Sequence, residues 1–452
     1  MSAATEKAKP GAFRNLSTVS LHKAAQIVGQ VVAVFTIPRL LGADDHGHFA
    51  FVLSYGYIAQ ILGDFGTLEV MSRFVPTMTT AESKQLYTRT LVFKVLAGIV
   101  FGIIAALVAL WLASAWLTLT WAALIGVGVA AHIVAWVPFQ FLLGLNRVGP
   151  WMIEQSWRQW VLIILLIALY PFFGVGGSLW AWALMELIFC VAGLWWVRHY
   201  WDSQELGLDW AYLSPYIRFG FGFFLANLVS AALYRSGPVL VETFLPDQPA
   251  QVGYTSLAIS VYLMPYLLLT QLALSLVPTL SEFYDQGDHD KLREWTHNFS
   301  RYSWLLGWLG TIGVWLAADW GVVFAFGADY SEAATAFKWI SLGIPLAGLL
   351  WAGNAISTVT GRGSVKFGAT LTALVAFVGM AIWLIPLYAA TGAAIALTVA
   401  ITANVIVLLL FLQPDFTLEW LLLAGSGILA IGALWAIERF QLSMIYWGIG
   451  LL

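Results

Sequence analysis

Polar and ionisable side chains recur at helical spacing inside the long apolar stretches of this sequence. They fall into four sets: Lys23, Gln26 and Gln30; Tyr57, Gln60 and Asp64; Asn227, Ser230, Tyr234 and the adjacent Arg235; and Tyr262, Tyr266 and Thr270. Residues at this spacing share one helix face, so each set predicts one polar stripe. Polar groups inside a membrane are costly and usually face a wet interior. We expect the stripes to line a cavity between two halves of the molecule; the alternative is hydrogen bonding between packed helices.

The charged members of these stripes, and two further residues, suggest more specific roles. Lys23 lies near one end of its helix, so it either serves the cavity or extends to the membrane surface. Arg235 lies deep in its helix, which favours a cavity role. Glu186 and His132 lie near the middle of apolar stretches, where each either takes up a proton or makes a structural hydrogen bond. Asp64 and Glu186 are the candidates for ion coupling.

Two ion pairs are predicted from position along the chain. Glu154 and Arg158 are spaced i, i+4 in the favourable order, which indicates a local pair. Lys23 and Asp64 lie at similar distances before and after the turn near Ala43. In an antiparallel hairpin such residues lie level, so we expect an ion pair that offsets the cost of burying either charge alone.

The sequence carries no recognisable catalytic motif. It contains no G-x-x-x-x-G-K-[ST] loop, no H-E-x-x-H and no G-x-S-x-G. Its single cysteine, Cys190, excludes an intramolecular disulfide and a cysteine metal cluster. The longest predicted outer loop, about residues 319–332, is too short for a catalytic domain. We therefore expect a protein that is not an enzyme and that uses no cofactor or metal.

The composition is that of a protein made of membrane-spanning helices. The chain is 60% hydrophobic and 10% charged, with a mean hydropathy of +0.83, whereas a soluble domain carries about 25% charged residues. We expect an all-α, polytopic membrane protein with spans near 17–40, 47–67, 91–113, 121–143, 151–170, 178–201, 216–240, 252–278, 299–318, 333–360, 367–388, 392–412 and 420–437. The apolar segment 441–452 is too short to cross alone.

The basic residues set the predicted orientation. Seventeen of the 21 Lys and Arg residues fall on one set of connections and adjoining helix ends, which the positive-inside rule places in the cytoplasm together with the N-terminus. The predicted organisation is a cytoplasmic tail (1–16), a six-helix N-lobe (17–201), a cytoplasmic linker (202–212), a six-helix C-lobe (213–412) and a C-terminal extra helix with a partial helix (413–452). Because the basic residues are scattered between helices, nothing indicates nucleic-acid binding.

Four short sequence patterns recur in the same order in the two halves of the chain. They pair 37–49 with 244–254, 74–78 with 276–280, 143–147 with 359–362, and 176–180 with 391–395. The last two pairs share one offset, 215 residues, from Arg147 to Arg362 and from Gly177 to Gly392. The shared order indicates an internal duplication. Since each half holds an even number of spans, we expect two lobes related as parallel repeats.

The segment 39–49 resembles a known family signature. Its sequence, RLLGADDHGHF, is similar to the R-x-L-G-x-x-x-x-G-x-[FY] turn of Wzx-type polysaccharide and O-antigen flippases, which belong to the multidrug/oligosaccharidyl-lipid/polysaccharide exporter superfamily. Gly253-Tyr254, Gly361-Arg362 and 392–394 resemble further motifs of that family, and the resemblance covers about residues 12–412. The chain departs from the pattern after Arg235, where the family often has Asp and this sequence has Ser236.

The resemblance implies a transport function. Family members flip an oligosaccharide on undecaprenyl pyrophosphate across the bacterial cytoplasmic (inner) membrane by alternating access, for O-antigen, lipopolysaccharide or other surface polysaccharides. It implies a V-shaped fold whose central cavity is lined by the four striped helices, with Arg235 or Lys23 offsetting the phosphate charge. It also implies membrane lipids and polysaccharide polymerase or assembly proteins as partners. The alternative is a proton- or sodium-coupled exporter of cationic drugs on the same scaffold; a membrane-embedded glycosyltransferase is disfavoured by the short outer loops.

Overall fold

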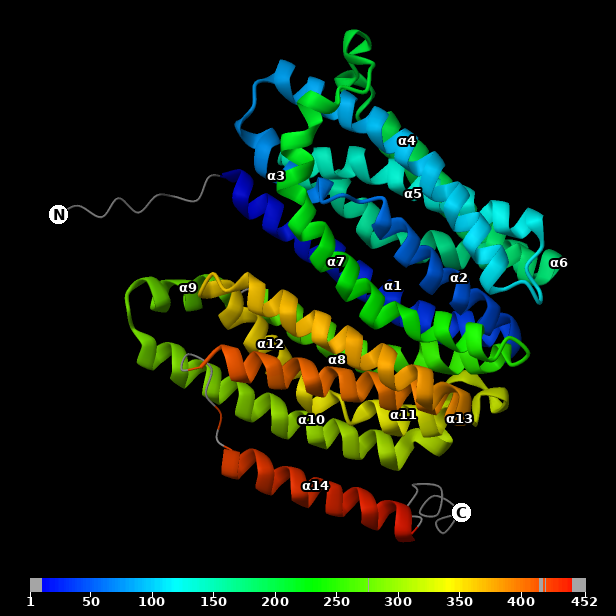
Figure 1. Cartoon of the computed structure of the whole chain (residues 1–452), viewed down its shortest axis with the longest axis vertical. Helices are drawn as coiled ribbons and strands as arrows, with labels where there is room; N and C mark the ends of the chain where they lie inside the picture. Colours follow the sequence, from blue (N-terminus) through cyan, green and yellow to red (C-terminus); the bar gives the residue numbers. More distant parts are fainter. Residues whose placement is uncertain (1–9, 275, 414–417, 419, 441–452) are drawn as a thin grey trace. The chain divides into compact units, whose positions relative to one another are not determined.

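The fold is entirely helical over the part of the chain that the structure describes. The structure is a computed structural model, and it describes residues 10–274, 276–413, 418 and 420–440. These residues form fourteen α-helices and four short 3-10 helices, with no strand among them (Figure 1). Seven of the helices are long and apolar enough to cross a membrane, and a bent pair makes an eighth candidate. The predicted all-α, polytopic class is confirmed, while the predicted partial span at 441–452 lies outside the described residues.

The chain divides into two compact units. Unit 1 comprises Met1–Leu41 and Val52–Leu228, and unit 2 comprises Gly42–Phe51 and Val229–Leu452. Two helices therefore belong to both units: α2 (Ala43–Leu62) begins in unit 2 and ends in unit 1, and α7 (Trp210–Phe244) begins in unit 1 and ends in unit 2.

Unit 1 is built on the long helices that follow α2. Its other helices are α1 (Pro10–Leu41), α3 (Thr67–Phe74), α4 (Thr80–Leu112), α5 (Leu119–Gly144) and α6 (Val148–Trp196). Helix α5 packs on α3, α4 and α6, and α1 packs on α6. Helix α4 begins with a capping box, in which Thr79 and Glu82 satisfy each other's backbone amides.

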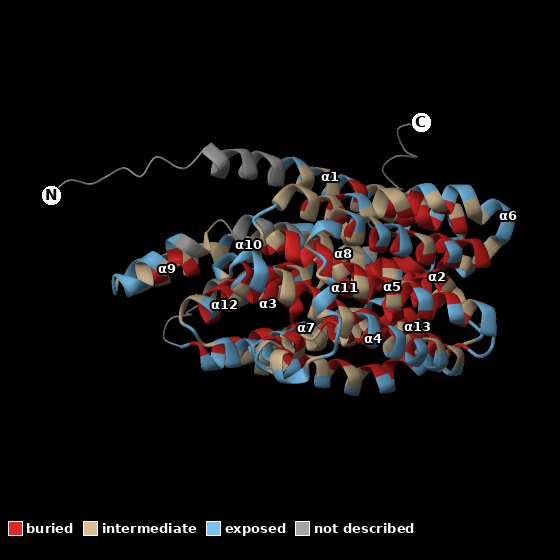
Figure 2. Ribbon diagram, turned by 90° about the horizontal axis from the view of Figure 1, so that it is seen from above, coloured by how far each residue is buried: buried red, intermediate tan, exposed pale blue. Residues whose placement is uncertain are grey.

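The two faces of α4 differ in a way that fits a membrane. One face carries small buried residues, so that a Cβ added to Gly102 would lie 2.7 Å from the Gly126 carbonyl oxygen of α5. The opposite face exposes Ile103, Leu107 and Trp111, which are 57%, 60% and 75% exposed. Small residues allow close helix packing in a bilayer, and large apolar residues suit contact with lipid. The alternation of buried and exposed residues along the helices is visible in Figure 2.

The predicted linker is fixed to unit 1 by one arginine of α4. The Arg89 guanidinium forms ion pairs of 2.6 Å with both Glu205 and Asp209, and it lies 4.5 Å from the ring centre of Tyr212. Two short 3-10 helices, Arg198–Tyr200 and Ser203–Glu205, shape this segment. Both acidic side chains of the linker therefore pair with Arg89 just before α7 begins.

Unit 2 contains the remaining helices. They are α8 (Pro249–Leu274), α9 (Val277–Asp285), α10 (His289–Phe326), α11 (Ala333–Ser341), α12 (Ile344–Val359), α13 (Gly363–Phe411) and α14 (Trp420–Phe440). Helix α10 packs on α11, α12 and α14, and α13 packs on α8, α11 and α12. The predicted span 333–360 is in fact the bent pair α11–α12, with a 44° bend. Pro345 explains the break, because it has no amide hydrogen to continue the bonds of α11.

The backbone geometry is alike at two turns of the chain that lie 215 residues apart. Arg147 and Arg362 are the N-cap residues of α6 and α13, and each amide donates a 2.8 Å bond back across a tight turn, to Leu142 and Ser357 respectively. The residues before them, Asn146 and 361, both have left-handed backbones, with φ of 57° and 69°. This is the Schellman end of the preceding helix.

Helices α6 and α13 are also matched internally. Each contains 49 residues and one non-helical residue, Gly174 in α6 and Ala389 in α13. A Cβ on Gly177 would lie 2.5 Å from the Leu169 carbonyl oxygen, a residue eight positions earlier. Eight residues of straight helix span about 12 Å, so the chain must reverse at Gly174. Each long helix is therefore a hairpin that holds two of the predicted spans.

The packing around the glycines of the two hairpins predicts different effects of a glycine-to-alanine change on thermal stability at two positions. Gly177→Ala should lower the midpoint of thermal unfolding, since the new methyl group would press on backbone atoms of Leu169 that cannot rotate away. Gly379→Ala in α13 should leave the midpoint unchanged or raise it slightly, because a Cβ there meets nothing within 4 Å and alanine favours helix. A Gly177→Ala variant as stable as the parent would contradict the tight hairpin.

Backbone conformation and close packing explain the glycines of the 39–49 signature. Gly42 alone separates α1 from α2 and has φ +76°, a conformation that other residues rarely adopt. A Cβ on Gly47 would lie 1.7 Å from the Pro249 carbonyl oxygen, so the start of α2 touches the start of α8 within unit 2. A Cβ on Gly253 would meet the His46 ring from the other side. The predicted turn at this place is confirmed.

Candidate functional site

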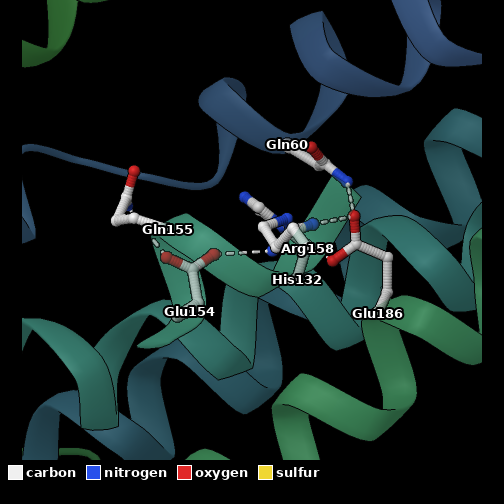
Figure 3. Close-up of polar contacts among 6 residues, drawn as sticks. All are labelled: Gln60, His132, Glu154, Gln155, Arg158 and Glu186. Carbon is white, nitrogen blue, oxygen red and sulfur yellow. Dashed lines mark hydrogen bonds and ion pairs between the residues drawn. The ribbon is translucent and has the colours of Figure 1, made fainter. Parts of the chain in front are cut away.

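A cluster of five polar side chains lies inside unit 1, and Figure 3 shows how they face one another. We call it the Glu186 cluster, and its members are Gln60, His132, Glu154, Arg158 and Glu186. They come from α2, α5 and both arms of the α6 hairpin. Four of the five are at most 4% exposed. Such a group needs internal partners, because no solvent is available to satisfy it.

Arg158 is the centre of the cluster. One guanidinium nitrogen donates to Glu154 Oε1 at 2.8 Å, which confirms the predicted local pair. The other forms an ion pair with Glu186 Oε1 on the second arm of the hairpin. Arg158 therefore ties the two arms together through both carboxylates, a use for which its planar, bidentate group is suited.

Glu186 has two further partners. Gln60 Nε2 donates to Glu186 Oε1 at 3.0 Å, and His132 Nδ1 lies 2.9 Å from Glu186 Oε2. The same Nδ1 lies 3.0 Å from Arg158. The ring position can hold either a proton or a lone pair, so it can bond only one of these neighbours at a time. With a proton it donates to Glu186, and without one it accepts from Arg158.

The formal charge of the cluster depends on the protonation of His132. Glu154 and Glu186 contribute two negative charges, and Arg158 contributes one positive charge. A proton on His132 brings the sum to zero, whereas neutral His132 leaves a net charge of −1 in a dry interior. Its second ring nitrogen, Nε2, is buried without a hydrogen-bond partner among the described residues. The cluster is therefore a buried network of charged groups in which one histidine lies between a cation and a carboxylate.

Asp64 belongs to a different buried pair from the one predicted. The Asp64 carboxylate lies 3.7 Å from the ammonium of Lys94, a residue of α4 whose side chain is fully buried. The same carboxylate accepts a hydrogen bond from the Thr67 hydroxyl at 3.1 Å. Lys23 instead donates to Gln26 within α1 at 3.1 Å. The predicted Lys23–Asp64 pair is wrong, because a third helix, α4, supplies the ammonium of Lys94 to Asp64.

Three of the predicted tyrosines come together in unit 2. Tyr234 of α7 and Tyr262 and Tyr266 of α8 have ring centres 5.9 to 6.2 Å apart, with planes inclined by 17° to 33°. Tyr262 is fully buried, while Tyr234 and Tyr266 are half-buried. We call these three nearly parallel rings the tyrosine cluster; Arg235 follows Tyr234 in the sequence of α7.

The remaining predicted residues are partly open to their surroundings. Gln26 and Gln30 on α1, and Ser230 and Arg235 on α7, are half-buried. Tyr57 is 39% exposed, and Asn227 is also exposed. The side chain of Thr270 lies outside what the structure describes. The second stripe is thus divided, with Tyr57 exposed and Gln60 and Asp64 buried inside unit 1.

Two buried charged residues have no counterpart among the predicted sites. Lys94 of α4 is 0% exposed. Glu242 of α7 is also 0% exposed, within unit 2. The available signal was a single charge with apolar neighbours on both sides, as in the sequence around Lys94. In the described residues no group of three or more His, Cys, Asp and Glu side chains is arranged to hold a metal ion.

Comparisons with known proteins agree with this architecture. The family model described as "Polysaccharide biosynthesis protein" matches residues 14–284. No curated protein matched in the sequence comparison. Among solved structures, the lipid II flippase MurJ in an inward closed conformation is similar, with a TM-score of 0.76, 13% identity, and coverage of 93% of this chain and 92% of that one. An inward-facing multidrug resistance MATE transporter of the MOP superfamily is similar with a TM-score of 0.70, 15% identity, and coverage of 87% and 94%. These likenesses show a transporter fold.

Proposed function

The chain belongs to the polysaccharide biosynthesis protein family, and from this premise we propose that it is a flippase for a lipid-linked oligosaccharide. The cargo is an oligosaccharide on undecaprenyl pyrophosphate, moved outward across the bacterial cytoplasmic membrane by alternating access for surface polysaccharide synthesis. In this proposal the N-terminus lies in the cytoplasm, as the distribution of Lys and Arg residues predicts. The single observation that carries the proposal is the family match over residues 14–284 on a multi-pass helical fold.

The tyrosine cluster and Arg235 supply chemistry that suits this cargo. A sugar–pyrophosphate group is hydrated and anionic, so it cannot cross hydrocarbon without replacement of its water. Half-buried Tyr234 and Tyr266 offer ring faces and hydroxyl groups to sugars. Arg235, the residue after Tyr234 in α7, offers a permanent positive charge that can bind phosphate oxygens in pairs. In the proposed flippase these residues bind the headgroup.

The Glu186 cluster supplies a means of coupling transport to a proton gradient. In this proposal His132 lies between the Arg158 cation and the Glu186 carboxylate, and a proton taken up there would bring the formal charge of the cluster to zero. Because Gln60 of α2 also bonds Glu186, the change reaches a helix that continues into unit 2 along the chain. We assign the coupling role to Glu186 and remove Asp64 from it, since Lys94 already neutralises Asp64.

The second candidate is a cation-coupled exporter of cationic drugs. Its support is the likeness to the multidrug transporter fold, together with the buried carboxylates of unit 1. A cationic drug needs an unpaired acidic group as its partner. In unit 1, Glu154 and Glu186 are both paired with Arg158, so these carboxylates favour proton binding over drug binding.

Complementation tests the proposed function. The gene is expressed in a bacterial strain that lacks its own flippase but still makes the lipid-linked oligosaccharide. We expect surface polysaccharide to return, with loss of the lipid-linked precursor from the inner leaflet. The control is the same strain with the empty vector. Both strains are also tested for resistance to cationic dyes. Dye resistance without surface polysaccharide would favour the drug exporter.

Arg235 provides a test of headgroup recognition. Arg235→Ala should reduce surface polysaccharide about tenfold or more at equal protein level, because the pyrophosphate loses a charge-assisted contact. Arg235→Lys should restore part of the activity, since lysine keeps the charge and loses the planar, bidentate group. Both proteins are quantified in the membrane fraction by immunoblotting. Normal export by the alanine variant would remove Arg235 from the mechanism.

A further inference from the structure

The bend between α2 and α3 places several oxygen atoms around one point inside unit 1. Helix α2 ends at Leu62, and the four-residue turn 63–66 leads to α3. Phe65 and Gly66 both have left-handed backbones, with φ of 54° and 70°, which turn the chain sharply. The turn is held tightly, because a Cβ on Gly63 would lie 2.3 Å from Ile133 of α5. Its carbonyl groups are therefore fixed in place.

The ammonium of Lys94 lies at that point. Lys94 Nζ donates to the carbonyl oxygens of Gly63 and Asp64, each at 2.6 Å, and lies 3.7 Å from Asp64 Oδ1. The Thr67 hydroxyl donates to the same Oδ1 at 3.1 Å, which fixes the carboxylate. The Lys94 side chain is fully buried. We call these three oxygens the 63–64 cage.

The 63–64 cage has the ligands of a small inorganic cation. Backbone carbonyl and carboxylate oxygens are the groups that bind hard cations, and they bind alkali ions where they replace the water shell. The negative end of the α2 dipole adds to the attraction for positive charge. The cage has one formal negative charge, from Asp64. A monovalent cation brings the sum to zero, whereas a divalent cation would leave a buried positive charge.

We propose that Lys94 is a built-in cation that fills a monovalent-cation site, and that its removal opens the 63–64 cage to sodium or potassium. In the native chain the tethered ammonium takes the place of an ion from solution. The bend is thus held closed at all times, independently of the salt present. The Glu186 cluster is a separate site, since its four residues other than Gln60 lie on α5 and α6.

The cage holds more than the turn itself. Gly66 packs so closely on α7 that a Cβ there would lie 2.1 Å from the Gly220 carbonyl oxygen. Phe65 stacks on Phe224 of α7, with ring centres 5.6 Å apart and planes inclined by 22°. Loss of the cation would release the first part of α7 from the rest of unit 1. The stability of the protein should therefore report on whether the cage is filled.

The test compares thermal unfolding in different chloride salts at equal ionic strength. The full-length protein is placed in lipid nanodiscs, and intrinsic tryptophan fluorescence is followed in sodium, potassium, methylammonium or choline chloride. Lys94→Ala and Lys94→Met should unfold at lower temperature than the parent in choline. Sodium, potassium or methylammonium should raise their midpoints by about 3 °C or more, since a ligand of the folded state stabilises it. Choline is too large to enter.

Three controls separate ion binding from general salt effects. The parent should show the same midpoint in all four salts, since Lys94 fills the cage. Lys84→Ala, on the same helix, should also be insensitive to the choice of cation, because Lys84 is only half-buried and lies outside the cage. Lys94→Met/Asp64→Ala should lose the response, since the carboxylate is gone. Methionine is shorter than lysine, so it leaves the ammonium position empty.

The proposal makes a definite claim even if the variants fold poorly. If Lys94→Ala and Lys94→Met fail to fold in choline but fold in sodium or methylammonium, the cage binds those ions. Equal midpoints in all salts for both variants would overturn the proposal. Failure of both variants to fold in every salt would overturn it as well, because rescue by a small cation is what it requires.

Discussion

Glu186→Gln is expected to lower proton-driven export about tenfold or more, and to remove its dependence on the pH gradient. Glutamine has nearly the same shape as glutamate, so the bonds to Gln60 and Arg158 can largely persist. It has no negative charge, so Glu154 and Arg158 balance each other while His132 is neutral. The cluster then gains nothing from taking up a proton. The measurement is export of labelled lipid-linked oligosaccharide by membrane vesicles at a series of imposed pH gradients.

A matched substitution separates this effect from the loss of any carboxylate. Glu282→Gln on α9 removes the same charge from an exposed position, where the Glu282 side chain accepts a bond from Gln286. Its export should equal that of the parent at every gradient. Retention of full, gradient-dependent export by Glu186→Gln would show that the cluster has only a structural role.

Arg158→Met is expected to lower the free energy of unfolding by about 3–5 kcal/mol, because it leaves two buried carboxylates without their shared cation. For a chain of this size we expect a fall of about 3–5 °C in the midpoint of thermal unfolding. Arg198→Met is the control, since Arg198 is exposed and, among the described residues, contacts the Trp195 carbonyl and ring. That control should change the midpoint by about 1 °C or less.

A double variant identifies the origin of the loss. Arg158→Met combined with Glu186→Gln should be more stable than Arg158→Met alone, because one of the two unpaired charges is removed. The comparison is made on purified protein in the same lipid, with the midpoint of unfolding as the readout. Simple addition of the two single effects would contradict a direct interaction between Arg158 and Glu186.

The sequence was sufficient for features that depend on neighbouring residues in the chain. The turn at Gly42 follows from the backbone freedom of glycine, and the break at Gly174 lies between two predicted spans. The repeat offset of 215 residues pairs Arg147 with Arg362, which begin α6 and α13 in the same way. The Glu154–Arg158 pair follows from helical spacing alone. Each of these depends on local geometry that a short segment determines by itself.

Contacts that involve a third helix cannot be predicted from the spacing of residues along one or two helices. Hairpin symmetry pairs Asp64 with Lys23 on the adjacent helix, but α4 passes beside the end of α2 and brings Lys94 to Asp64 instead. Gln60 was expected to face a cavity, but the second arm of α6 brings Glu186 within 3.0 Å of it. Periodicity shows that a helix has a polar face. It does not show which of several neighbouring helices that face meets.

The central claim is that this chain moves a lipid-linked oligosaccharide, and a reconstituted system tests it most directly. The purified protein is placed in liposomes with fluorescent undecaprenyl-pyrophosphate oligosaccharide, and the label on the outer leaflet is measured with a membrane-impermeant quencher after a pH gradient is imposed. We predict that the protein accelerates transfer between leaflets well above the rate of protein-free liposomes, and that the gradient raises the rate further. Transfer at the protein-free rate, with export of a cationic dye by the same liposomes, would contradict the flippase assignment.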